Sequence, residues 1–219
     1  MAKPTSGGAG GSGGRQRQNV STQAETQAAP PREFPFVSLG NEGAAATDYD
    51  NFLIPRFNDQ FERMGGNADR IVEYESYSSP INKALRREKP LVGKVKRVTE
   101  VLDRAMHPLD EAIIVHRGAQ IPEMFDLYNS GALVGAVVND KGFMSTSINR
   151  GIANIYSGAR GRKGIIIKLT IPKGKRVAYT DPTGRFSIQR EIIIDRGSSI
   201  RVTRAQLIGG KLEVEGVVE

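Results

Sequence analysis

Cysteine and tryptophan are absent from this chain of 219 residues, and histidine occurs only twice. The absence of cysteine excludes disulfides, thiolate metal sites and a cysteine nucleophile. Two histidines, His107 and His116, exclude a multi-histidine metal centre and leave few candidates for a histidine-based triad. No apolar run reaches the ~18 residues that span a bilayer, and the N-terminus lacks the apolar stretch of a secretory signal. We therefore expect a soluble protein without a membrane segment, exported, if at all, by another route.

Positive charge is in moderate excess, because 31 Lys and Arg against 24 Asp and Glu give a net charge of +7. Such an excess favours anionic partners: nucleotides, nucleic acid or acidic protein surfaces. Residues 83–97 and 160–176 are two basic runs. Proteins that bind single-stranded nucleic acid need aromatic side chains beside the charge, on which bases stack. Near these basic runs, Tyr156 is the one aromatic residue that the sequence offers for this. Solvated basic faces are therefore favoured over a nucleic-acid surface.

Residues 1–35 form a tail whose composition differs from the rest of the chain. Its start is rich in glycine and serine, its end contains prolines, and no aromatic residue precedes Phe34. Such a segment cannot bury enough apolar surface to offset its ordering entropy, so we expect it to be disordered. It can serve as a linker, an export signal or a tether. Residues 45–219 are expected to form a single domain.

The first half of that domain has helical periodicity. Helices are predicted over residues 48–64, 67–75, 80–87 and 92–106. Pro55 predicts a break or kink in the first helix, since proline removes a backbone donor. Asn67 is a candidate cap of the second helix. Ser79 and Pro80 are typical of an N-cap and a first helical position, which indicates that the third helix is separate.

The second half consists mostly of strands. Strands are predicted over residues 112–118, 165–171, 176–180, 192–194, 200–202 and 212–214, and short helices over 122–129 and 150–156. This order predicts an α+β fold, in which N-terminal helices pack on a mixed or antiparallel β-sandwich core. A glycine-rich dinucleotide fingerprint and a P-loop are both absent, so a doubly wound dinucleotide domain and a P-loop NTPase are not supported.

Arg117 ends the first predicted strand and is followed by Gly118. An arginine in an otherwise apolar strand must meet an anion or a carboxylate, because its guanidinium stays charged. Its planar fork suits a diphosphate, and a structural salt bridge is the alternative. Strand alternation points His116 to the opposite face, where we expect a packed histidine rather than a base.

Two further groups of polar residues are candidates for the site. Ser145, Thr146 and Ser147 place three hydroxyls together, which commonly cap a helix or bond to the backbone. Gln189 and Glu191 are two residues apart, so they share one face of an extended chain. Since Glu191 begins a hydrophobic strand, its carboxylate is either paired with a nearby arginine or held at a cleft.

Asn82 and Arg86 are four residues apart on the third predicted helix, so they share a face. Alone, such a polar pair is typical of a solvated helix surface.

Together, an arginine at a strand end, a Ser-Thr-Ser run and a Gln-x-Glu entering a strand resemble the Arg–Ser–Glu class of mono-ADP-ribosyltransferases. This class includes clostridial Rho-modifying and binary-toxin exoenzymes, type III effectors and phage ADP-ribosyltransferases. Residues 77–86 resemble the family's helix that contacts NAD, and residues 156–160 are similar to its loop over the phosphate and nicotinamide. Residues 171–174, followed by Tyr179, resemble the strand-turn-strand after that loop. The resemblance covers roughly residues 45–219.

The resemblance implies that NAD is the co-substrate and that no metal is required. Arg117 and Arg86 would hold the diphosphate, with Arg160 as a third cation. Asn82 would bond the adenosine side. The other residues implied to contact NAD are Gly118, Ser145, Thr146, Ser147, Tyr156 and Glu191.

The resemblance also implies a catalytic group made of Arg117, Ser145 and Glu191, in which the serine orients the carboxylate. Glu191 would accept a hydrogen bond from the 2′-hydroxyl of the nicotinamide ribose. Breaking the glycosidic bond develops positive charge on that ribose, which a fixed carboxylate stabilises. A target side chain or water would then capture the ribose, and capture by water would be an NAD glycohydrolase side activity.

Gln189 bears on the acceptor. In the resembling family, Glu-x-Glu members usually modify arginine, whereas Gln-x-Glu members include Rho-directed enzymes that modify asparagine and some that modify guanine. Phe186 resembles the exposed aromatic residue by which Rho-directed enzymes contact their target. We therefore expect an Asn- or Gln-type acceptor in a host-cell protein, with arginine as a further option.

Two alternatives to a protein-directed enzyme remain. One is a guanine-directed transferase that acts on nucleic acid, and the other is a non-enzymatic interaction or virion domain on the same scaffold. The expected protein is a monomeric toxin, effector or phage enzyme that modifies a host.

Overall fold

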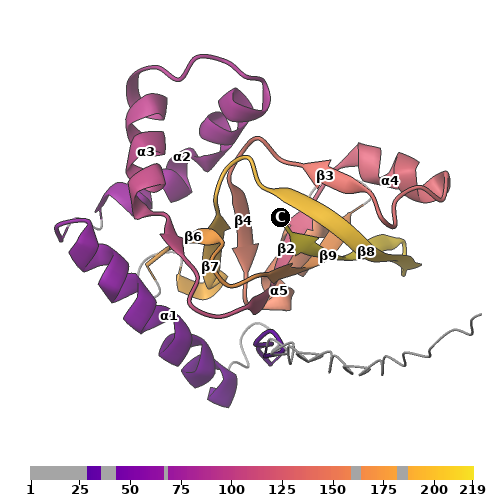
Figure 1. The fold of residues 1–219 in the computed structure, drawn as a ribbon, viewed down its shortest axis with the longest axis horizontal. Coiled ribbons are helices and arrows are strands. Elements are labelled where there is room, and N and C mark those ends of the chain that lie inside the picture. Colours follow the sequence, from indigo (N-terminus) through magenta and orange to yellow (C-terminus); the bar gives the residue numbers. More distant parts are fainter. Residues whose placement is uncertain (1–28, 36–42, 67–68, 159–163, 182–186) are drawn as a thin grey trace, which may run out of the picture.

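The computed structural model describes residues 29–35, 43–66, 69–158, 164–181 and 187–219. Within these residues three helices precede a nine-stranded sheet, and two more helices lie between strands of the sheet (Figure 1). The α+β class with N-terminal helices on a mixed sheet is confirmed. No helix in this part of the chain is long and apolar enough to cross a membrane.

The three N-terminal helices are α1 (Gly43–Arg63), α2 (Asp69–Arg86) and α3 (Gly93–Ala105). Helix α1 continues through Pro55, so the predicted break there is wrong. Helix α2 contains Pro80 in its interior, so the prediction of two separate helices is also wrong. The helix persists because a proline removes one backbone bond, while Tyr74 and Ile81, on either side of it, are both buried in the core. Asn67 lies outside the described residues.

The strands form one sheet in the order β1-β6-β7-β4-β2-β5-β9-β8-β3. Their bounds are β1 His107–Pro108, β2 Ile113–Ala119, β3 Val137–Asn139, β4 Met144–Ser147, β5 Ile165–Ile171, β6 Arg176–Tyr179, β7 Glu191–Ile194, β8 Ser199–Ile208 and β9 Lys211–Val218. The pair β5–β9 is parallel, and the other pairs are antiparallel. The sequence did not predict β1, β3 or β4.

The core lies between the helices and the curled sheet. Strand β7 is buried along its whole length, and β5 is buried at all but two positions, as their isoleucine-rich sequences predict. Helices α1 to α3 cover the side of the sheet that contains β6, β7 and β4, whereas α4 (Pro122–Asn129) lies near β3 and β8 (Figure 1). Strand β2 is paired with β5 along its whole length, so its residues are firmly placed.

Helix α5 (Arg150–Gly158) packs closely on β2, and Gly118 makes this possible. A Cβ at Gly118 would lie 2.0 Å from the carbonyl oxygen of Ala153 and 2.7 Å from the backbone nitrogen of Ser157. No side chain fits in that space. The glycine after Arg117 therefore has a packing role, which brings the helix against the strand that carries the arginine.

Part of the expected tail is packed against the domain. The Arg32 backbone N–H donates to Ala112, and its carbonyl accepts from Ile114, so this segment pairs with the start of β2. Phe34 is 5% exposed and packs edge-on against Phe52 at 4.9 Å between ring centroids. The expectation that disorder extends to residue 35 is corrected here, because Phe34 has a place in the core. Residues 1–28 lie outside the described part of the chain.

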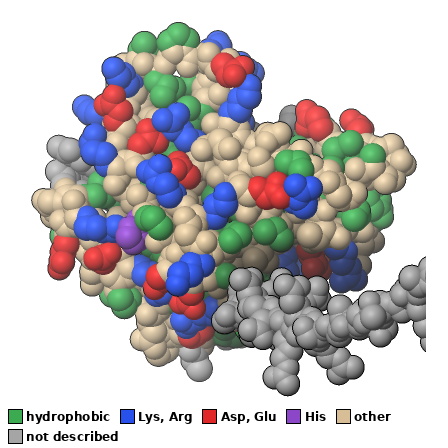
Figure 2. Space-filling view, in the orientation of Figure 1, with side chains coloured by type: hydrophobic (Ala, Val, Ile, Leu, Met, Phe, Trp, Pro, Cys, Tyr) green, Lys and Arg blue, Asp and Glu red, His purple; other side chains and the backbone are tan. Residues whose placement is uncertain are grey.

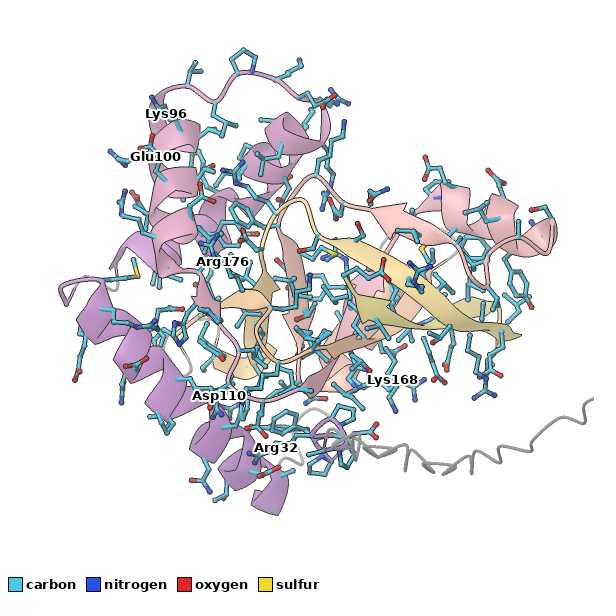
Figure 3. All side chains as sticks on the ribbon, viewed as in Figure 1. Arg32, Lys96, Glu100, Asp110, Lys168 and Arg176 are labelled. Atoms are coloured by element: carbon cyan, nitrogen blue, oxygen red, sulfur yellow. The ribbon has the colours of Figure 1, made fainter. Side chains whose placement is uncertain are left out.

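Surface charges of the two signs are interspersed on the face shown in Figure 2. Three cations of the basic runs pair with acids: Lys96 with Glu100 at 3.8 Å, Lys168 with Glu33 at 2.6 Å and Arg176 with Asp195 at 3.0 Å. These three cations come from different elements and lie far apart in Figure 3. Their pairing with acids agrees with the expectation of solvated faces.

Candidate active site

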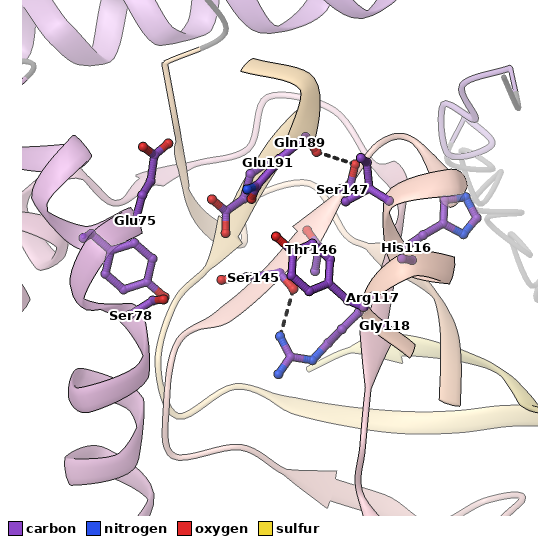
Figure 4. Close-up of a pocket in the computed structure, with 14 residues that line it drawn as sticks. Glu75, Ser78, His116, Arg117, Gly118, Ser145, Thr146, Ser147, Gln189 and Glu191 are labelled. Atoms are coloured by element: carbon purple, nitrogen blue, oxygen red, sulfur yellow. Dashed lines mark hydrogen bonds between the residues drawn. The ribbon is translucent and has the colours of Figure 1, made fainter. Parts of the chain in front are cut away.

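A cavity of about 280 Å³ opens where β2, β4 and β7 face helices α2 and α5 (Figure 4). The sequence-predicted site residues that line it are Arg117, Gly118, Ser145, Thr146, Ser147, Tyr156, Gln189 and Glu191. They come from four separate segments of the chain. The fold therefore brings together the residues that the sequence analysis grouped.

The sheet places these residues in neighbouring strands, with β4 in the middle. Ser147 pairs with His116 of β2 on one side and with Glu191 of β7 on the other. The Arg117 guanidinium crosses toward β4 and donates to the Ser145 carbonyl oxygen at 2.8 Å. Arginine, serine and glutamate thus meet across three adjacent strands (Figure 4).

Glu191 begins β7 and is only 8% exposed. Burial raises the pKa of its carboxyl to about 7, against the smaller opposing effects of a hydrogen bond with Ser145 and the positive charge of Arg117. Desolvation disfavours the charged form of any carboxyl group, whereas a hydrogen-bond donor and a cation favour it. Near neutral pH the Glu191 carboxyl is therefore divided between its protonated and ionised forms.

The three adjacent hydroxyls have different roles. Thr146 Oγ1 donates to the Ile192 carbonyl at 2.6 Å, and Ser147 Oγ donates to the Gln189 carbonyl at 2.6 Å. These two bonds fix the backbone around the start of β7, as the structural interpretation of the run predicts. Ser145 alone interacts with the Glu191 side chain.

Gln189 and Glu191 do not lie in one extended segment, so the argument from strand alternation is wrong. Residues Ser187–Gln189 form a 3₁₀ turn, and Arg190 has a φ of +45°. The turn and this positive φ interrupt the extended chain before β7 begins. Both side chains nevertheless line the same cavity, because the turn presents Gln189 beside the first residue of the strand.

Arg86 and Arg117 approach the same acid, Asp140, which the sequence analysis did not identify. Arg86 binds Asp140 with two hydrogen bonds of 2.8 and 2.9 Å, and Arg117 Nη2 lies 3.7 Å from the same carboxylate. Arg86 does not line the central cavity but lies beside it. An isolated Asp in a turn carries no sequence signal of this contact.

Asn82 lies next to Arg86, as the four-residue spacing predicts, and its amide is used within the protein. Its Oδ1 accepts from the Phe143 N–H at 2.8 Å, and its Nδ2 donates to the Tyr74 hydroxyl at 3.3 Å. A Cβ at Gly142 would lie 2.7 Å from Asn82 Oδ1, so the loop before β4 passes directly over the amide. Asn82 thereby ties α2 to β4.

Helix α2 also supplies three cavity residues that the sequence analysis missed: Tyr74, Glu75 and Ser78. Burial raises the pKa of the Tyr74 hydroxyl. Burial, and then the negative charges of Glu191 and Asp181, raise the pKa of Glu75 to about 7. Tyr74 lies two helical turns before Asn82, a spacing that could have revealed it. Glu75 carries no comparable signal.

His116 is 8% exposed, and its burial agrees with the expected packed histidine. Burial, assisted by the positive charges of Arg150 and Lys168, lowers its pKa to about 4. The ring is therefore neutral at physiological pH. His116 is among the residues that line the cavity, on the strand that also carries Arg117.

Tyr156 is half-exposed at the cavity rim, in the last turn of α5. The segment that begins at Tyr156, which resembles a covering loop, is therefore helical as far as Gly158. Arg160 and Phe186 lie outside the described residues.

Comparison with known proteins identifies the family. The family described as ADP-ribosyltransferase exoenzyme matches residues 66–218, so the chain belongs to this family. It is 28% identical to the mono-ADP-ribosyltransferase C3 of Clostridium botulinum D phage, with 68% of each chain covered.

Solved structures agree on the fold. Plx2a, an ADP-ribosyltransferase toxin from Paenibacillus larvae, is 21% identical, with a TM-score of 0.63 over 85% of this chain and 98% of its own. C3stau2 from S. aureus, solved with NAD, is 19% identical, with a TM-score of 0.57 over 86% of this chain and 99% of its own. At such identities the similarity concerns the fold.

Proposed function

We propose that this chain cleaves the bond between nicotinamide and ribose in NAD and transfers ADP-ribose to a protein side chain. The observation that carries the proposal is the buried carboxylate of Glu191, with Ser145 and Arg117 beside it in one cavity. Family membership and the NAD bound to C3stau2 support NAD as the substrate.

Glu191 stabilises the transition state in this mechanism. Loss of nicotinamide leaves positive charge on the ribose, and a fixed carboxylate attracts that charge more than it attracts the neutral ribose of the substrate. The low exposure of Glu191 strengthens this effect, since little water screens the charge. Ser145 holds the carboxylate, and Arg117 favours its ionised form.

Arg117 and Arg86 are proposed to hold the diphosphate of NAD. Both guanidinium groups approach one carboxylate, Asp140, and this arrangement supports the proposal of an anion site beside them. A diphosphate offers more acceptor oxygens than Asp140 and would compete for the same donors. Because the Asn82 amide is bonded to Phe143 and Tyr74, we propose that it supports the adenosine side through the groups that it positions.

Other cavity residues have more modest proposed roles. Thr146 and Ser147 form the floor and fix the turn that carries Gln189. Tyr156 offers a partly exposed ring at the rim, where a flat nicotinamide could stack. Gly118 lets helix α5 pack against β2, which brings Tyr156 close to Arg117.

Gln189 supports an Asn- or Gln-type acceptor, because its amide can donate to and accept from another carboxamide. An arginine acceptor remains open, and hydrolysis of NAD is the side activity expected when water replaces the acceptor. A guanine-directed enzyme finds less support, since cations of both basic runs are paired with acids of this chain. We propose a host-cell protein as the target, with the enzyme acting as a toxin, effector or phage product.

Replacement of Glu191 by Gln tests the proposed activity. We expect Glu191→Gln to lower the rate of nicotinamide release on the order of 10²–10³-fold, because the amide cannot stabilise developing positive charge. The NAD dissociation constant should change little, since Arg117 and Arg86 remain. Glu215→Gln is the matched control, because Glu215 is a surface acid paired with Arg204. Near-wild-type turnover of Glu191→Gln would show that the carboxylate is not catalytic.

The acceptor class can be read from a labelling experiment with NAD that carries its label on the adenosine phosphate. The purified chain is incubated with host-cell extract, beside Glu191→Gln. We expect label that depends on Glu191 and is released by protease. Label released only by nuclease would instead establish nucleic acid as the acceptor.

A further inference from the structure

Glu75 is a cavity carboxylate that has no partner among the described residues. It lies on α2 and faces the cavity across from Glu191 (Figure 4). No described residue donates a hydrogen bond to its carboxylate or forms an ion pair with it. Glu73, two residues earlier, is paired with Arg97 at 3.1 Å and Lys94 at 3.6 Å. The contrast sets Glu75 apart from an ordinary acid of a charged helix.

The surroundings of Glu75 hold it ready to exchange a proton. Burial raises its pKa to about 7, and the negative charges of Glu191 and Asp181 add to the rise. The other titratable groups that line the same cavity are Tyr74, His116, Arg117, Tyr156 and Glu191. A carboxyl with a pKa near the working pH is suited to general acid–base catalysis.

The reaction needs such a base. An amide or water that attacks the ribose must lose a proton as the new bond forms. Glu191 is engaged with the ribose in the proposed mechanism, and the Gln189 amide cannot accept a proton. Among the described residues that line the cavity, Glu75 is the carboxylate besides Glu191 and can accept this proton.

We propose that Glu75 is the general base that accepts the proton of the acceptor. The bond between C1′ of the ribose and nicotinamide breaks, and its electron pair leaves with nicotinamide. A lone pair of the acceptor forms the new bond to C1′, and the acceptor's proton passes to the Glu75 carboxylate. The site thereby suits a neutral acceptor that carries an N–H or O–H, such as a carboxamide or water. This inference rests on the proposed function.

The test compares Glu75→Gln with wild type in NAD hydrolysis, where water is the acceptor. We expect the rate of nicotinamide release to fall on the order of 10²-fold, with an unchanged NAD dissociation constant. Glu73→Gln is the matched control on the same helix and should hydrolyse NAD at the wild-type rate. Unchanged NAD binding also shows that the variant is folded.

Azide separates a base from a structural residue. As an anion without a proton, azide can attack C1′ unaided, so we expect it to restore nicotinamide release by Glu75→Gln and to form ADP-ribosyl azide. It should not restore Glu191→Gln. At acidic pH, the logarithm of the wild-type rate should rise with pH at a slope approaching 2, because both Glu75 and Glu191 must ionise. For Glu75→Gln in azide the slope should be about 1, since only the ionisation of Glu191 remains.

Two results would overturn the inference while leaving the proposed function intact. The first is that Glu75→Gln hydrolyses NAD at the wild-type rate. The second is that its rate of nicotinamide release stays low in the presence of azide. In both cases nicotinamide release by the wild type would still depend on Glu191. Absence of nicotinamide release from the wild type would overturn the proposed function and this inference together.

Discussion

At the scale of single residues, the site is defined by opposing effects on one carboxylate. Burial favours neutral Glu191, whereas Ser145 and Arg117 favour its charged form, and burial is the largest effect. The proposed mechanism needs the charged form, so in this account the protein keeps an ionisable group where its charge is unfavourable for folding. Such a site exchanges stability for activity, and this exchange can be measured.

Glu191→Gln should therefore stabilise the protein at alkaline pH. The folded pKa is about 7, above the unfolded value of ~4.3, so the stabilisation from the neutral carboxyl is present below that lower value and lost as pH rises through 7. A glutamine does not ionise, so the variant does not lose this stability as the pH rises. We compare the free energy of unfolding of the variant with that of wild type at each pH. We expect this difference, variant minus wild type, to be larger at pH 8 than at pH 4.5 by about 1–3 kcal/mol. Urea denaturation at both pH values measures this, and a pH-independent difference would contradict it.

Arg117→Lys should weaken NAD binding on the order of tenfold. Lysine keeps the charge but lacks the planar fork, which bonds the Ser145 carbonyl and approaches Asp140. Calorimetric titration of NAD measures the change. Arg204→Lys is the control, because Arg204 is 62% exposed in an ion pair with Glu215. Equal affinity of Arg117→Lys and wild type would indicate that Arg117 is structural.

At the scale of elements, close packing fixes the distances between the strands and helices that form the site. Helix α5 rests on β2 at Gly118, where a Cβ would lie 2.0 Å from the Ala153 carbonyl oxygen. Helix α2 is tied to the loop before β4 through Asn82 and the Phe143 N–H. The cavity is thus bounded by helices whose positions depend on single small or polar residues.

Gly118→Ala should destabilise the protein by about 3 kcal/mol, because the added methyl group overlaps the backbone of α5. Loss of NAD binding should accompany it, since Arg117 and Tyr156 lie on the two displaced elements. Gly158→Ala is the matched control, as its Cβ would meet only the end of Lys211 at 3.7 Å. Chemical denaturation compares the two, and equal midpoints would show that α5 can move aside without loss.

Most elements followed from the sequence, and two misses have a clear physical cause. Strand β4 has the sequence Met144-Ser145-Thr146-Ser147, whose hydroxyls are also typical of caps and turns. It is a strand because β2 and β7 pair with it on both sides, which no local pattern reveals. The continuity of α2 across Pro80 likewise depends on tertiary burial of its flanks. The strong isoleucine strands β5 and β7 were predictable because their pattern is local.

At the scale of the whole molecule, the order of helices before strands was enough to predict the α+β class. The candidate site was predictable for Arg117, Ser145, Gln189 and Glu191, because their motifs resemble a family. Glu75 and Asp140 were not, since both depend on which segments meet in space. The start of the folded domain was misjudged for the same reason, because Phe34 is buried by distant α1.

Truncation tests that boundary. We expect a chain that starts at residue 29 to unfold at the same denaturant concentration as the full chain, since residues 1–28 have few apolar side chains to bury. A chain that starts at residue 36 loses Phe34 and the pairing of Arg32 with β2, and should be less stable by about 3 kcal/mol. Equal stability of the two truncated chains would contradict this.

The central claim is that the residues around Glu191 cleave the nicotinamide–ribose bond of NAD and transfer its ADP-ribose to a protein. The most direct measurement uses NAD labelled separately in its nicotinamide ring and in its adenosine phosphate, incubated with the purified chain and host-cell extract. We predict that the nicotinamide label is released to solution while the adenosine label becomes covalently attached to protein, and that Glu191→Gln does neither. Retention of both labels in unreacted NAD, with wild type and variant alike, would contradict the account.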